Sequence, residues 1–496
     1  MKKFKKNKPE LSVDRRSFLA KSSLALTSLG LSPLISAEIL NDLAQMVIPG
    51  AHAQSTAPAG KRRFVSLHLR AGAPLQELTP PPSWVPSVTN TINTAVNFHT
   101  DMAAISATAT SSGRLTYLPS TAAALVPHAD SIASTYAGVQ MDGHSSIWSN
   151  QTAGMRVDDN NIPAMAPPSP TVFNAAKNQT GSPIAGVFFN ASGDSVVNSK
   201  NMYSDLGRVT NTNMAISNAD DFVALFGPKA LRFTNPERDA VLRAVGSLGD
   251  TQLGRLKSRL TSGSVDEAKK SQGEAITLMQ TNVQAAIISD YNAYNAAATA
   301  SGLNIAPPRG MGYPLQKALA LSAVSFTRNL AQTTQLAINI TDFHGFNSTD
   351  RTGNLLPAQV ATYLANNLAN FIAYMKATDD PINPGTKLWD NTVISITTEF
   401  WRDSILSVGS DNGDGGMNGV IWMGGPVKGG TLGDASGQTG GAQGFNPTTG
   451  ALGGELLHPA SIYRTTLSLL GHAQADVSAA MGAQSGMGYL VSAAMK

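Results

Sequence analysis

The chain has 496 residues, about three times the roughly 150 residues that serve as a prior for one domain, so one large domain with insertions fits as well as two domains. A composition of 42% hydrophobic and 14% charged residues is too apolar for a disordered chain, and the absence of cysteine excludes disulfides, thiolate metal sites and cysteine nucleophiles. Eight of the 36 basic and four of the 33 acidic residues precede Gln54, which leaves 28 basic and 29 acidic residues beyond it, so no nucleic-acid partner is expected.

Residues 1–53 predict a twin-arginine (Tat) export signal. A lysine-rich start leads into Arg15-Arg16-Ser17-Phe18-Leu19, and a weakly apolar run follows over residues 22–37. Ala51-His52-Ala53 is a small-x-small cleavage site. We therefore expect the Tat translocase as a partner, cleavage after Ala53, and a periplasmic, cell-surface or secreted protein with no stable membrane span after cleavage. An uncleaved membrane anchor is the alternative.

After a linker at residues 54–61, residues 62–496 predict a single α/β domain. Alternating apolar residues indicate a first strand at Phe64–Leu69 and a second at Ile184–Phe189. Helical spacing between residues 235 and 300 indicates a helical insertion or cap, which we place at about residues 215–305. Alternating helices and strands beyond it are typical of a mostly parallel central sheet flanked by helices. The predicted helices are 315–332, 357–376 and 460–470, and the predicted strands are 336–340, 392–397 and 420–423.

A glycine-rich segment, residues 409–454, contains 17 glycines. Such a segment is either a flexible surface loop or backbone that passes close to other groups. We expect flexibility for its second half. Residues 410–415 are similar to part of a calcium loop, but Ile421 stands where an EF-hand needs Glu, which excludes an EF-hand.

Polar residues follow the predicted strands at the ends where α/β sheets place their sites. Asp342 and His344 come directly after one strand, and such a pair can bind a divalent ion such as zinc or manganese. Glu399 and Arg402 follow the next strand and can act as a ligand or base and as a clamp for phosphate or sulfate. Asp411 precedes the last strand. The structural alternatives are a capping aspartate beside a packed histidine, and an internal Glu–Arg ion pair.

Two further histidines are candidates from their positions alone. His458 opens the last predicted helix, and His144 lies between Gly143 and Ser145. A lone histidine is more often structural than catalytic. The chain contains no Gly-x-Ser-x-Gly, Walker or His-Glu-x-x-His motif, which excludes the commonest serine-hydrolase, P-loop and zincin assignments.

Six segments share their order and spacing with a known family. Residues 424–430 are similar to its Gly-Gly-x-Val-Lys-Gly-Gly, and residues 342–344 and 399–402 to its Asp-Thr-His and Glu-Phe-Gly-Arg. The chain thereby resembles a Tat-exported domain-of-unknown-function family in the alkaline-phosphatase/sulfatase clan. The remaining matching segments are Leu69–Pro74, Arg114–Pro119 and Gly143–Trp148.

The resemblance implies an alkaline-phosphatase/sulfatase-like fold and metal-dependent hydrolysis of phosphate or sulfate esters. Two positions depart from the family pattern, since Pro74 stands at an early Asp and Asn412 at a His. These departures leave open an altered metal site, or a non-catalytic scaffold or binding protein of the same fold with a small-molecule or polymer ligand. The resemblance places a divalent ion (Zn, Mn or Ca) on Asp342, His344, Asp411 and His458, and catalytic roles on Glu399, Arg402 and His144.

Overall fold

The structure is a computed structural model, and it describes residues 62–70, 75, 78–85, 105–136, 170–177, 186–190, 213–216, 243–244, 247, 283–303, 315–339, 356–398, 419–436, 441–486 and 488–496. The predicted export signal, its cleavage site and the linker lie outside these residues. Within them, no helix combines the length and the apolar character that crossing a membrane requires.

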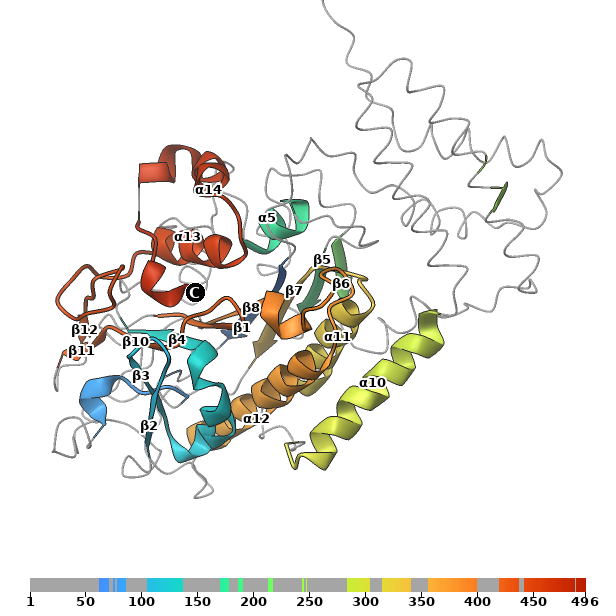
Figure 1. Cartoon of the computed structure of the whole chain (residues 1–496), viewed down its shortest axis with the longest axis horizontal. Coiled ribbons are helices and arrows are strands. Elements are labelled where there is room, and N and C mark those ends of the chain that lie inside the picture. Colours follow the sequence, from blue (N-terminus) through green and yellow to red (C-terminus); the bar gives the residue numbers. More distant parts are fainter. Residues whose placement is uncertain are drawn as a thin grey trace, which may run out of the picture.

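The central sheet consists of β1 (Arg63–Arg70), β4 (Ile132–Thr135), β5 (Gly186–Asn190), β6 (Asn213–Ile216), β7 (Thr333–Asn339), β8 (Thr392–Thr398), β9 (Ile421–Gly424) and β10 (Gly430–Leu432). Their order across the sheet is β10-β4-β9-β8-β1-β7-β5-β6 (Figure 1). From β6 to β8 in this order the strands pair in parallel, whereas β9 runs antiparallel to its neighbours β8 and β4. The expected α/β architecture with a mostly parallel sheet is confirmed.

One face of the sheet is apolar along the middle strands. Val65 and Leu67 of β1 and Ile394 and Ile396 of β8 are fully buried, because alternate residues of a strand point to the same face. They share one core with α11 (Leu315–Thr327), α12 (Leu356–Ala377) and the 3-10 helix η4 (Ser120–Ser131). Figure 1 shows α11 and α12 together on one side of the sheet.

The opposite face carries α5 (Pro170–Lys177), α13 (Pro459–Leu469) and α14 (Gln474–Met481). Phe64, Val393 and Trp422 point to this side and form a second core with residues of α5, α13 and α14. The Trp422 Nε1–H group donates to Thr466 Oγ1 of α13 at 3.0 Å. The sheet is therefore covered by helices on both faces, as Figure 1 shows.

Helix α10 (Val283–Ala300) belongs to the predicted helical insertion and packs on the outside of α11 and α12. The rings of Tyr294 and Tyr374 meet edge to face at 5.2 Å, and Arg328 pairs with Asp290 at 2.5 Å. The described end of the insertion is thus anchored on the helices of the main domain. The predicted helical region between residues 248 and 282 lies outside the described residues.

Two element boundaries differ from the prediction by three residues or more. Strand β7 begins at Thr333 rather than at residue 336, because Thr333 already pairs with Phe64 near the start of β1. Helix α11 ends at Thr327 rather than at residue 332. Asn329 adopts a left-handed conformation there (φ 51°), and asparagine tolerates this conformation at a helix end better than most residues.

The second half of the glycine-rich segment is closely packed where it is described. Strands β11 (Asp434–Ser436) and β12 (Gly441–Gln443) pair, and the backbone of Phe445 bridges to Leu452 and Glu455. A Cβ added at Gly454 would lie 2.2 Å from the Phe445 carbonyl oxygen, and one at Gly444 would lie 2.3 Å from the Gly454 oxygen. The expectation of flexibility is wrong for these residues, because glycine is needed there for close backbone approach.

Two of the segments that carry the family resemblance contact each other. Arg114 precedes β3 (Leu115–Leu118) of a hairpin with β2 (Ser106–Ala109) and donates from Nη2 to the Gly429 carbonyl at 3.1 Å and the Ala493 carbonyl at 2.5 Å. A Cβ at Gly430 would lie 2.6 Å from Arg114 Cβ. These motif residues therefore have a structural role.

The remaining described elements are short 3-10 turns. They are η2 (Pro82–Trp84), η5 (Leu388–Asn391), η7 (Gly482–Gly486) and η8 (Ser492–Ala494).

Candidate functional site

The carboxyl ends of β8, β1 and β7 lie side by side at one edge of the sheet. Strand β1 pairs in parallel with both neighbours, so that Arg70 lies opposite Asn339 of β7 and Leu69 lies opposite Thr398 of β8. In α/β sheets, ligands bind in the crevice outside the carboxyl ends of the strands. This edge is therefore the candidate functional site.

The two predicted polar clusters begin at these strand ends. Asp342 comes three residues after the last residue of β7, and Glu399 comes directly after the last residue of β8. The strands that lead into the two clusters thus lie on either side of β1. The predicted site residues that lie outside the described residues are Asp342, His344, Glu399, Arg402, Asp411 and His144.

A polar row crosses the three strands on the face that carries α5 and α13. Ser66 on β1 is the register partner of both Gln335 on β7 and Ser395 on β8. Ser66 and Ser395 keep exposures of 6% and 5%, whereas Val65 and Leu67 on the opposite face have none. The row is therefore buried slightly less completely than the apolar face. The sequence alone does not reveal this row, because its residues come together only through the pairing of distant strands.

His68 extends the polar row toward the carboxyl edge. It is the register partner of Thr397, and its Nδ1 lies 3.1 Å from Thr397 Oγ1. At the amino end of the same face, Phe64 and Val393 are register partners and both are apolar. Along β1 and β8 this face changes from apolar to polar toward the candidate site, and the change on β1 is already visible in the alternate residues Phe64, Ser66 and His68 of the sequence.

The side-chain amide of Gln335 is the least satisfied group of the row. The residue is 2% exposed, and neither Nε2 nor Oε1 has a hydrogen-bond partner among the described residues. A buried polar group without a partner costs roughly 1–3 kcal/mol. Packing of the described elements gives no reason for a glutamine at this position, so the amide points to a ligand or an ordered water.

His458, the one predicted metal ligand within the described residues, forms the N-cap of α13. Its Nδ1 accepts a hydrogen bond from the Ala460 backbone N–H at 3.0 Å, and burial lowers the pKa of the imidazole below its ordinary value. In a neutral imidazole whose Nδ1 accepts, Nε2 carries the proton, so His458 would have to give up the cap to bind a metal. Across the described ranges, no three His, Cys, Asp or Glu side chains are grouped for a metal ion.

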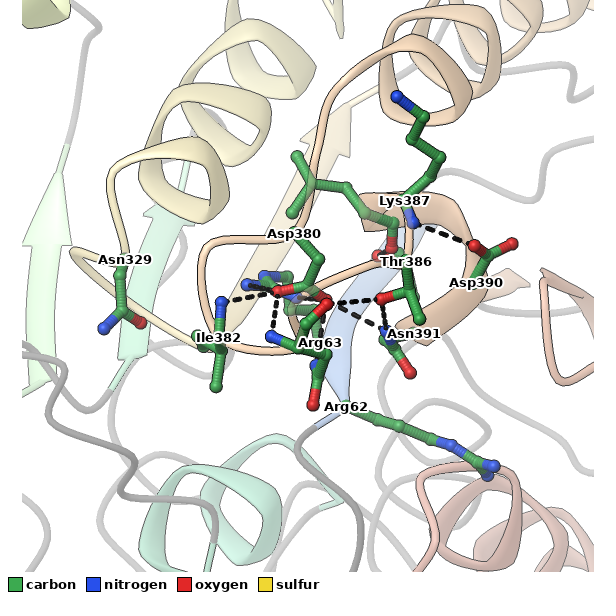
Figure 2. A network of polar contacts seen from close by, with 12 residues as sticks. Arg62, Arg63, Asn329, Asp380, Ile382, Thr386, Lys387, Asp390 and Asn391 are labelled. Atoms are coloured by element: carbon green, nitrogen blue, oxygen red, sulfur yellow. Dashed lines mark hydrogen bonds and ion pairs between the residues drawn. The ribbon is translucent and has the colours of Figure 1, made fainter.

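A buried charged network lies at the opposite, amino edge of the same strands (Figure 2). The Arg63 guanidinium donates to both carboxylate oxygens of Asp380, at 2.6 and 2.8 Å. The carboxylate also accepts from the backbone N–H groups of Ile382 and Asn383 and from the side-chain amides of Asn383 and Asn391, at 2.8 to 3.0 Å. Every lone pair of Asp380 is used, which makes this network structural.

The pKa of Asp380 agrees with that role. Burial by itself raises the pKa of the carboxyl, but the hydrogen bonds and the charge of Arg63 outweigh burial and hold it below its ordinary value. Asp380 is therefore ionised at neutral pH and unavailable for proton transfer. The network ties the loop before β8 to the start of β1.

No family model matches the chain, and no curated protein matches it. The site is therefore characterised by its own geometry and by the motifs at its strand ends.

Proposed function

We propose that this protein is an exported, hydrolase-like member of the alkaline-phosphatase/sulfatase clan that acts on phosphate or sulfate esters at the carboxyl ends of β7, β1 and β8. The observation that supports it is the order β8-β1-β7, because the Asp342 and Glu399 clusters follow the two outer strands. Neighbouring strands lie about 4.8 Å apart, so β7 and β8 are separated by about 10 Å. In this proposal, one small substrate spans the distance between the two strand ends.

Each cluster has a chemical role in this proposal. Asp342 and His344 would hold a divalent ion (Zn, Mn or Ca), with Asp411 in support. A bound ion polarises the ester oxygen and lowers the pKa of a water. Arg402 would hold the anionic oxygens through paired N–H donors, and Glu399 would serve as a base or ligand.

The departures from the family pattern at Pro74 and Asn412 limit the number of ligands available to a metal centre. Proline cannot ligate a metal through its side chain, and a side-chain amide is a poor zinc ligand. We therefore propose a mononuclear or altered centre. The same two positions favour the second candidate function, a non-catalytic scaffold or binding protein of the same fold.

Metal content tests the proposal directly. The purified full-length chain should retain about one divalent ion or more, measured by elemental analysis, because a hydrolase of this class needs at least one. His344→Ala should lose the ion, since it removes one of two proposed ligands. His128→Asn, at a described histidine outside the proposed site, is the matched control and should keep it.

Hydrolysis of an aryl phosphate and an aryl sulfate by the metal-loaded chain completes the test. Activity that disappears with Arg402→Ala would support the proposal. A chain that retains no ion and cleaves neither ester would contradict it and leave the scaffold or binding protein.

A further inference from the structure

We propose that the polar row of Ser66, Gln335 and Ser395, extended by His68 and Thr397, is the floor of a binding site for uncharged hydroxyl groups of a carbohydrate or polyol. This inference rests on the proposed function for its place beside the strand ends, but it needs neither a metal ion nor hydrolysis.

The position of the row supports a ligand site. It crosses the three neighbouring strands β7, β1 and β8 near their middle, and His68 and Thr397 continue it toward the carboxyl ends of β1 and β8. The hydroxyl-bearing residues Ser66, Ser395 and Thr397 keep 5–6% exposure. The opposite face of the same strands is closed, with Leu67 and Ile396 fully buried.

The unpartnered amide of Gln335 is the second observation. An apolar residue at this position would be more stable than an amide without partners, because a buried polar group that lacks partners destabilises the folded chain. The amide offers one donor nitrogen and one acceptor oxygen side by side. A ligand hydroxyl, which both donates and accepts, fits it directly.

The chemistry of the amide and hydroxyl groups sets the class of ligand. Gln335, the two serines and Thr397 are neutral, and His68 is the one titratable side chain of the row. Each of these groups both donates and accepts, as do the hydroxyls of a sugar. The row therefore complements the neutral part of a ligand, while the anionic part belongs to the strand-end clusters of the proposed function.

Binding of D-glucose, D-galactose and myo-inositol to the full-length chain tests the inference. Binding is measured by saturation-transfer NMR, and EDTA in the sample removes any contribution from a metal ion. We expect saturable binding of at least one of the three, with propionamide as the neutral amide comparison. Gln335→Met should weaken that binding at least tenfold and, since it removes two unpartnered atoms, raise the melting temperature of the ligand-free chain by about 2 °C.

Thr334→Val is the matched control variant. Thr334 directly precedes Gln335 in β7. Its side chain lies on the opposite face, and its buried hydroxyl also lacks a partner among the described residues. This variant should raise the melting temperature and leave binding unchanged. Binding that survives in His344→Ala would support the inference even if the proposed metal site fails. Three results would overturn the inference: no saturable binding, equal binding in Gln335→Met, or binding of propionamide alone. Each would mean that ordered water, not a ligand, occupies the polar row.

Discussion

Arg63 and Asp380 show how a charge pair becomes stable inside this sheet. Both side chains are fully buried, and they meet through two hydrogen bonds at 2.6 and 2.8 Å. The cost of desolvating the two charges is offset only because the remaining lone pairs of Asp380 are also filled. Each partner alone would be an uncompensated buried charge.

Arg63→Leu should therefore lower the free energy of unfolding by about 3–5 kcal/mol, measured by urea denaturation. Removing Asp380 as well, in the Arg63→Leu/Asp380→Leu variant, should recover part of that loss. Asp379→Asn is the control, because the pair of Asp379 with Lys387 is exposed and should contribute about 0–1 kcal/mol. Equal losses for Arg63→Leu and the control would contradict the structural role of the buried pair.

His128 gives the folded chain a dependence on pH. Burial, and after it the charge of Lys376, lower the pKa of His128 to about 4, although a backbone hydrogen bond with Pro127 opposes this shift. Lys376 Nζ lies 3.0 Å from His128 Nδ1. A depressed histidine pKa means that the unfolded chain binds the proton more tightly. The stability from neutral His128 should be complete above pH 6.5 and be lost as the pH falls from 6.5 to about 4.

Urea denaturation between pH 7.5 and pH 4 checks this dependence. The wild-type chain should lose more stability over that range than His128→Asn. Lys376→Met should raise the pKa of His128 and narrow the pH range over which stability is lost. A parallel pH profile for wild type and His128→Asn would show that His128 titrates normally in the folded chain.

At the level of elements, the glycine-rich segment is the feature whose structure was least expected. In its described second half, Gly444 and Gly454 meet neighbouring backbone at distances that leave no space for a Cβ atom. Glycine content alone does not distinguish this packing from flexibility, because both exploit the missing side chain.

Gly454→Ala should destabilise the chain by roughly 1–3 kcal/mol, since its Cβ would overlap the Phe445 carbonyl. Gly486→Ala is the matched control, because nothing lies within 4 Å of its added Cβ. Thermal unfolding of the two variants measures the difference. Tolerance of alanine at both positions would restore the interpretation of a flexible loop.

The predicted Tat export concerns residues 1–53, which lie outside the described residues. Because Tat requires the arginine pair, Arg15→Lys combined with Arg16→Lys should leave precursor in the cytoplasm, as detected by fractionation and immunoblotting. Lys5→Arg combined with Lys6→Arg keeps the charge and should be exported normally. Normal export of the twin-lysine variant would disprove the Tat assignment.

The alternation of helices and strands was predictable because hydrophobic periodicity is local along the chain. The positions of β1, β7, β8, α11 and α12 follow from it to within a few residues. The polar clusters after β7 and β8 were equally visible as residues that follow a strand.

Pairing between distant segments was not predictable from periodicity. Arg63 and Asp380 are 317 positions apart, and neither has a local pattern that indicates its partner. The row of Ser66, Gln335 and Ser395 exists only because β1 inserts between β7 and β8 in one register. Strand order and register depend on how the whole sheet packs against its two helical layers, so only the tertiary structure could decide which polar residues meet.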